Sequence, residues 1–178
     1  MKGYRWVTSD LKSQQGQVQW RIGEWYTQKG ELKLCENGLH ASKEPLDSLK
    51  YIFGERWFIC EVKGKILHDS DKFAAEKMRL IQEIPNAKML IVRFAVDCAK
   101  RCLPNFKKQF PEDKRPRQAI EAVEAWLVEP TNENLEKVKT AARSAAESAA
   151  ESAWSAELKW QSNHFKKLIK DALKNAEA

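Results

Sequence analysis

The placement of glycine divides this chain of 178 residues into two parts that must fold differently. All seven glycines lie between residues 3 and 64, and from about Asp97 onward there is none. Glycine adopts the positive φ of tight turns and weakens helices, so the first part suits short strands and the second suits helices. The sequence predicts an α+β protein, with a β-rich domain over residues 1–95 followed by a helical domain over residues 96–178.

Three segments of the first part are rich in β-branched and aromatic residues, which predicts strands. They cover residues 4–8, 17–22 and 57–62.

Before the last of these strands lies the stretch LCENGLHASKEPLDSLKYI, residues 34–52. It predicts a turn at Gly38, a short extended piece through His40 and a helix capped by Ser42. This account leaves His40 without a role. It is either a hydrogen-bonded core residue or part of a reaction site.

Prolines and capping residues divide the second part into helices. We expect one helix from Asp97, kinked or restarted at Pro104, and another that begins at Pro116 and stops before Pro130. A long helix from Thr131 then carries the repeat AARSAAESAAESAWSAE.

Composition argues against a membrane protein and a metalloprotein. No apolar run approaches the roughly 20 residues that cross a bilayer, and MKGYRWVTSD lacks the apolar core of a signal peptide. The cysteines at 35, 60, 98 and 102 and the histidines at 40, 68 and 164 do not have the spacing of metal ligands. We therefore expect a soluble, intracellular protein with free thiols and no metal site.

The formal net charge of +6 and the pI near 9.1 leave nonspecific nucleic-acid binding open as an alternative function. The basic residues are spread in pairs over separate segments, at 107–108, 114–115 and 166–167. That distribution favours a solvated surface over a phosphate-binding groove.

The order YRW, IGEWYTQKGELKLCENGLHAS and EPLDSLKYIFGERWFICEVKGKIL resembles a small domain of unknown function common in tailed-phage and prophage genomes. The resemblance covers roughly the first 85 residues, and LCENGLHA is its most specific part.

The same order is similar, more loosely, to ADP-ribosyltransferases, which use NAD. That resemblance implies a first-strand group at Arg5, a second-strand motif at His40 and Ser42, a ring-stacking Tyr51 and a catalytic Glu83. The carboxylate would hold the ribose hydroxyl while positive charge develops on the sugar. The chain has the adjacent pair QE where the family has Glu-x-Glu or Gln-x-Glu, which favours a related fold without the activity.

The segment CAKRCLPNFKKQFPEDKRPRQAIEAVEAWL, residues 98–127, together with the alanine-rich helix after it, resembles proposed immunity proteins of bacterial polymorphic toxin systems. The resemblance covers about 75 residues. Such proteins cover the surface of a partner, so the resemblance implies a shaped face and no reaction centre.

The sequence as a whole favours a non-enzymatic phage or mobile-element accessory protein of the immunity or anti-defence type. Its partner would be a toxin or a defence component, it would need no cofactor, and it would act in the cytoplasm of a bacterial host cell. The alternatives are an ADP-ribosyltransferase-like enzyme that binds NAD and, more weakly, a nonspecific nucleic-acid binder. The question of enzymatic activity stays open.

Overall fold

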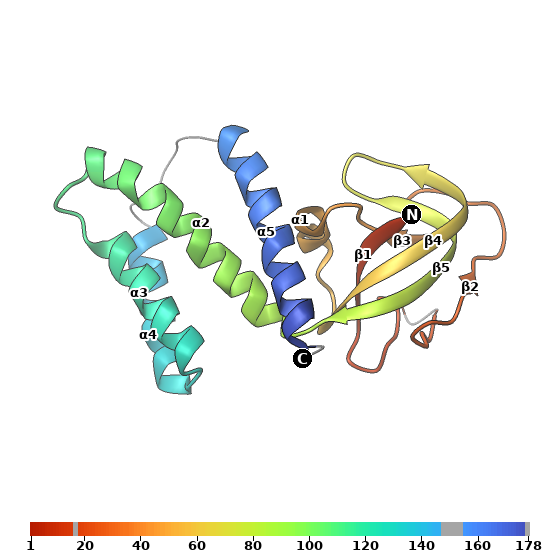
Figure 1. Ribbon diagram of the computed structural model, residues 1–178, viewed down its shortest axis with the longest axis horizontal. Coiled ribbons are helices and arrows are strands. Elements are labelled where there is room, and N and C mark those ends of the chain that lie inside the picture. The colour runs from red at the N-terminus through yellow and green to blue at the C-terminus, as the bar shows by residue number, and fades with distance from the viewer. Residues whose placement is uncertain (16–17, 147–154, 177–178) are drawn as a thin grey trace. The chain divides into compact units, whose positions relative to one another are not determined.

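The computed structural model describes residues 1–15, 18–146 and 155–176 (Figure 1). In these residues every strand precedes Pro85 and every helix of more than ten residues follows it. The predicted α+β class is confirmed.

Contacts within the chain define two compact units. The first unit combines residues 1–87 with the C-terminal segment from Phe165, and the second is Lys88–His164. This division differs from the expected boundary at residue 95, because helix α2 (Ala87–Gln109) already begins at Ala87 and because the C-terminal segment packs on the sheet.

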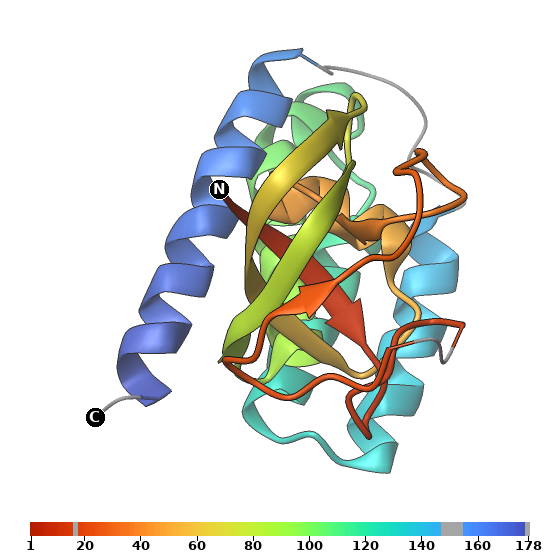
Figure 2. The ribbon, with the colours of Figure 1, turned by 90° about the vertical axis from the view of Figure 1, so that its right-hand side faces the viewer.

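The first unit is built on an antiparallel sheet of five strands (Figure 2). They lie in the order β1-β4-β5-β2, and β3 also pairs with β5. The longest pairing is the β4–β5 hairpin, whose register runs from Trp57 opposite Ile84 to His68 opposite Phe73. The strands are β1 (Lys2–Val7), β2 (Tyr26–Thr27), β3 (Leu39–Ala41), β4 (Arg56–His68) and β5 (Phe73–Ile84).

Two of the three predicted strands are confirmed, since β1 and β4 overlap the predicted segments 4–8 and 57–62. The strand predicted over residues 17–22 is wrong for the described residues 18–22, where Gln19 forms only an isolated bridge with Lys12. The aromatic residue that suggested it, Trp20, reaches the core from a loop and is 1% exposed.

The sequence does not predict strand β5. Its sequence, FAAEKMRLIQEI, mixes alanines and charged residues with the apolar ones, and these residue types are depleted in strands. Pairing with β4 decides its conformation in place of its own propensity.

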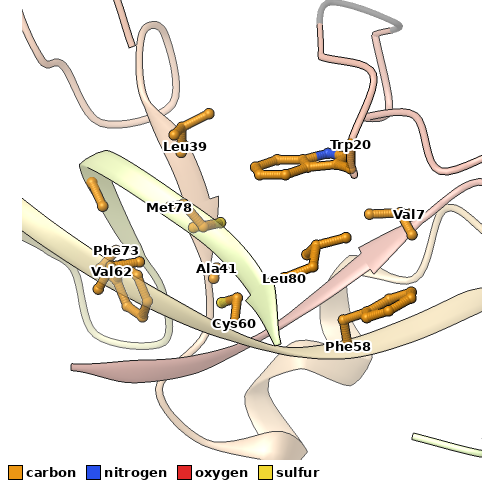
Figure 3. Packing of buried hydrophobic residues seen from close by; sticks show 11 residues of the cluster. Val7, Trp20, Leu39, Ala41, Phe58, Cys60, Val62, Phe73, Met78 and Leu80 are labelled. Carbon is orange, nitrogen blue, oxygen red and sulfur yellow. The ribbon is translucent and has the colours of Figure 1, made fainter. Parts of the chain in front are cut away.

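One face of the sheet carries the hydrophobic core of the first unit (Figure 3). Burying a large apolar side chain contributes roughly 1.5–3 kcal/mol, so this cluster is the main source of stability. Its buried members are Val7, Trp20, Leu39, Ala41, Phe58, Cys60, Val62, Phe73, Ala75, Met78 and Leu80.

The opposite face carries an aromatic stack. Because side chains alternate along a strand, Trp57 points away from the core that Phe58 enters. The Trp6 ring lies parallel to the Trp57 ring with centres 5.2 Å apart, and Phe165 stacks on Trp57 at 5.6 Å. The short helix α1 (Pro45–Ser48) is held here as well, because the Trp6 indole donates a hydrogen bond of 3.1 Å to the Ser48 carbonyl.

The second unit contains most of α2, together with α3, α4 and the first part of α5. Helices α3 and α4 are joined by a short connection and pack against each other. Their bounds are α3 (Arg115–Val128), α4 (Asn132–Ala146) and α5 (Ser155–Ala176).

Two of the predicted helix starts are confirmed. Pro116 lies in the first turn of α3, and the Thr131 hydroxyl accepts a hydrogen bond of 3.2 Å from the Asn134 backbone N–H at the start of α4. The start expected at Asp97 is wrong, because α2 begins ten residues earlier and runs on through Pro104. The alanine-rich repeat beyond residue 146 lies mostly outside the described residues.

Asp97 has a different role, which sequence spacing does not reveal. Its carboxylate lies 2.7 Å from the Nε2 atom of His164 on α5, and the His164 ring stacks on Trp160 with centres 4.6 Å apart. The contact joins α2 to α5 within the second unit.

We expect Phe165→Ala to lower the free energy of unfolding by about 3–5 kcal/mol, because the ring is fully buried against Trp57. The exposed neighbour Lys167 offers a control, and Lys167→Ala should change stability by about 0.5 kcal/mol or less. Denaturant unfolding followed by tryptophan fluorescence measures both. Equal effects of the two substitutions would contradict the role given to the stack.

Candidate functional site

A cleft of about 290 Å³ lies in the first unit beside β1 and β3. Four of the five predicted site residues line it: Arg5, His40, Ser42 and Tyr51. The rest of its wall includes Lys72 and residues of the turn 35–38. The structure therefore brings together groups from four separate segments of the sequence.

Arg5 places a positive charge inside the protein. One terminal nitrogen of its guanidinium donates a hydrogen bond to the His40 carbonyl, and the group lies over the Trp20 ring, 5.0 Å from the ring centre. Its Nε is buried and has no hydrogen-bond partner among the described residues. Burial lowers the pKa of Arg5 to about 10, which corresponds to a cost on the order of 3 kcal/mol. The group nevertheless remains charged at neutral pH.

The His40 ring is engaged by the backbone of the neighbouring turn. Its Nε2 accepts a hydrogen bond of 3.0 Å from the Cys35 N–H, and the ring also bonds to the backbone of Gly38. Burial, followed by the charge of Arg5, lowers the pKa of His40, so the ring is neutral at pH 7. These contacts fasten the turn to β3 and leave the ring poorly placed to exchange protons with a ligand.

Ser42 takes part in strand-like pairing and does not cap a helix. Its backbone N–H and carbonyl pair with Tyr4 at 3.0 and 2.8 Å, and the residue is 2% exposed. The N-cap position of α1 is Glu44, and no side chain caps that helix. The prediction that Ser42 caps the helix is wrong, because the helix begins at Pro45 and Ser42 lies two residues before the N-cap position.

The rim of the cleft is a small polar network around Tyr51. The Tyr51 hydroxyl donates a hydrogen bond of 2.8 Å to Asp71, whose other oxygen lies 3.2 Å from the Lys50 ammonium group. The Lys72 ammonium lies 4.9 Å from the centre of the Tyr51 ring. A hydrogen bond with the Cys35 side chain raises the pKa of Lys72, which keeps this second cation charged.

The structure does not bring Glu83 to this cleft. Glu83 lies on β5, where both of its carboxylate oxygens pair with the guanidinium of Arg56 on β4, at 2.9 and 2.5 Å. Sequence reasoning missed three charged or reactive residues that do line it, namely Cys35, Glu36 and Lys72. Lys72 directly precedes β5. Because the sequence does not predict this strand, it gives no reason to place Lys72 near the cleft.

A second hollow, of about 620 Å³, lies among α2, α3 and α4 of the second unit. We call it the apolar groove. Among the described residues of this unit only Phe94, Val96 and Ile120 are buried, so most apolar side chains of the helices stay partly exposed. The groove is lined by Ile91, Val92, Ala95, Val96, Ala99, Cys102, Leu103, Phe106, Pro116, Ala119, Ile120, Val123, Trp126, Leu135 and Val138.

Neither a metal site nor a membrane-spanning helix is present among the described residues. No group of three or more histidine, cysteine, aspartate or glutamate side chains in that part of the chain is placed to hold a metal ion. No described helix is long and apolar enough to cross a membrane.

Comparison with known families gives two matches. Residues 1–92 match the family model described as Domain of unknown function (DUF7666), and residues 83–164 match the one described as Imm-5 like putative immunity protein. No curated protein and no solved structure matches the chain. The expected resemblance to immunity proteins in the helical part is confirmed, as is a domain of unknown function in the first part. The phage origin and the likeness to ADP-ribosyltransferases stay predictions.

We expect His40→Ala to lower the free energy of unfolding by about 1–3 kcal/mol, because it leaves backbone groups of the turn unpaired. Since folding lowers the pKa of His40, the unfolded chain takes up the proton first as the pH falls below about 6.5. The stability difference between wild type and variant should therefore be full above that pH and shrink below it. Urea unfolding between pH 5 and 8 measures this.

The exposed residue His68 offers the control for that measurement. His68→Ala should leave the stability close to that of the wild type. A constant difference between wild type and His40→Ala over the whole pH range would contradict the titration argument.

Proposed function

We propose that this chain, which belongs to the family defined by the domain of unknown function DUF7666, is an immunity-type protein that neutralises a protein partner by binding it. The observation that carries the proposal is the match of residues 83–164 to an immunity-protein family. The binding face would be the apolar groove of the same segment.

The physical argument rests on the apolar groove. Apolar surface that stays in contact with water is unfavourable, and contiguous apolar patches on soluble proteins commonly mark interaction sites. The groove is lined by side chains of α2, α3 and α4, almost all of them apolar. A partner that inserts an apolar helix or loop would bury this surface, as a helix does in other groove complexes.

We further propose that the partner is a toxin or a defence component encountered in the bacterial cytoplasm, where a mobile element would provide the protein. Lys107 and Lys108 on α2 are exposed beside the groove residue Phe106 and form no ion pair with another described residue. They would favour a partner with acidic groups at the edge of its apolar face.

A matched pair of substitutions on α3 tests the proposed face. Val123 lines the apolar groove, whereas Val128 is 87% exposed and lies outside it. We expect Val123→Glu to weaken binding of the cognate toxin by at least about tenfold, since it places a charge in the apolar interface. Val128→Glu should leave binding unchanged. Protection of toxin-expressing cells and calorimetry with the purified toxin domain measure the two effects.

Thermal unfolding of both variants controls for folding in this test. A Val123→Glu protein that melts like Val128→Glu and still protects would remove the groove from the proposal. Failure of the wild type to form a stoichiometric complex with any toxin it protects against would reject the binding mechanism.

A second candidate function is NAD binding, with or without ADP-ribosyl transfer, in the cleft of the first unit. The observation that favours it is the presence of Arg5, His40, Ser42 and Tyr51 in one cleft. Glu83 lies elsewhere, and the carboxylate that lines the cleft is Glu36. In a transferase of this arrangement, Glu36 would have to hold the ribose hydroxyl.

Labelled NAD tests the second candidate. Transfer of label to an acceptor protein should be lost in Glu36→Gln and kept in Glu83→Gln, because only the first residue reaches the cleft. Absence of both NAD binding in calorimetry and label transfer by the wild type would reject this candidate and leave the immunity role untouched.

A further inference from the structure

Arg5 differs from the other arginines of the sheet in having no carboxylate partner in the described part of the chain. Arg56 pairs with Glu83, and Arg79 pairs with Glu61 across the same β4–β5 hairpin. Arg5 forms no ion pair with any described residue. A guanidinium has five N–H donors, and the hydrogen bond to the His40 carbonyl uses one of them.

Burying the charge of Arg5 without a counter-ion lowers the stability of the fold. A destabilising residue of this kind points to a functional role. A buried ion without a counter-ion loses its hydration, and an apolar side chain of similar size in its place is often neutral or stabilising. Such costs are concentrated at functional sites. The group is also held rigidly, between the Trp20 ring and the His40 carbonyl, which prepares its free donors for a ligand.

The charges around Arg5 favour a negatively charged ligand. A second cation, Lys72, lines the same cleft, and His40 is neutral at pH 7. The acidic residue of the lining, Glu36, is exposed to solvent and does not pair with Arg5. The cleft therefore carries an excess of positive charge inside a wall of protein, where a negative ligand is attracted more strongly than at an open surface.

The size and lining of the cleft limit the ligand further. About 290 Å³ is at the lower end of the range of small-molecule sites. Tyr51 offers a flat apolar surface at the rim, and polar groups such as Gln14 face the same space. These features suit a small molecule with one acidic group.

We propose that this cleft binds a small ligand through an oxyanion, a carboxylate or a phosphate, that docks on the guanidinium of Arg5 with Lys72 as the second cation. The planar fork of an arginine matches both groups and can bind either through two parallel hydrogen bonds. The site is independent of the proposed immunity role, which rests on the second unit. It requires no transfer reaction, and a phosphate of NAD would be one of its possible occupants.

Thermal unfolding with simple anions tests the proposal on the full chain. Inorganic phosphate and acetate are each titrated at pH 7 against sodium chloride of equal ionic strength. We expect at least one of them to raise the melting temperature of the wild type in a saturable way, because a ligand that binds only the folded state stabilises it. The anion that acts at the lower concentration distinguishes a phosphate site from a carboxylate site.

Variants then assign the effect to Arg5. Arg5→Met should remain folded and lose the response to the anion, with affinity reduced at least tenfold, while Lys72→Met should weaken it less. Arg79→Met is the matched control, because Arg79 is paired with Glu61, and it should keep the full response. If Arg5→Met fails to fold, the conservative Arg5→Lys replaces it and should weaken binding by losing the fork.

A direct readout on the wild type completes the test. The Arg5 Nε–H resonance, identified by its loss in Arg5→Lys, should shift during the anion titration. The proposal is overturned if neither phosphate nor acetate exceeds chloride, or if Arg5→Met responds as strongly as Arg79→Met. Anion binding without NAD binding would support this site and reject only the NAD candidate.

Discussion

The first unit depends on the stack of Trp6, Trp57 and Phe165. Strand β4 lies between two strands of the sheet, and its side chains alternate between the core face, which receives Phe58, and the face of the stack, which receives Trp57. Without Phe165 the second face would present the Trp57 ring to water. The part of the last helix that begins at Phe165 therefore belongs to the β-rich unit, although it comes from the far end of the chain.

The same alternation explains the position of the unpaired arginine. Along β1, Trp6 enters the stack, so its neighbours Arg5 and Val7 point to the opposite face, which is the core face. Trp20 belongs to the core and also lies over the Arg5 guanidinium. The Arg5 guanidinium therefore lies at the border between the core and the cleft. Burial of that charge also helps to keep His40 neutral, which leaves the histidine suited to holding the turn.

The two units differ in how completely they bury their apolar residues. The sheet of the first unit has a filled core on one face and an aromatic stack on the other. The described helices of the second unit leave most of their apolar side chains around the open groove. Covering such a helix surface with another apolar surface lowers the free energy. That contrast is the physical basis for the proposal that the groove of the helical unit binds a partner.

Local chemistry determined what could be read from the sequence. Glycine placement gave the α+β class, and helix starts at Pro116 and Thr131 followed from backbone and capping preferences that act over a few residues. The turn before β3 and the extended conformation of His40 followed in the same way. Arg5, His40, Ser42 and Tyr51 were candidates through family resemblance, and their spacing could not show that they share a cleft.

Tertiary structure decided the rest, because it depends on pairing between distant segments. Strand β5 exists through its ladder with β4, and the register of that ladder gives Glu83 to Arg56 and so removes it from the cleft. Asp97 has the composition of a helix cap, but packing of α5 makes it the partner of His164. The sequence alone determined the α+β class, the strands β1 and β4 and the helix starts at Pro116 and Thr131. Only the folded chain decided which charges meet an opposite charge, and Arg5 meets none among the described residues.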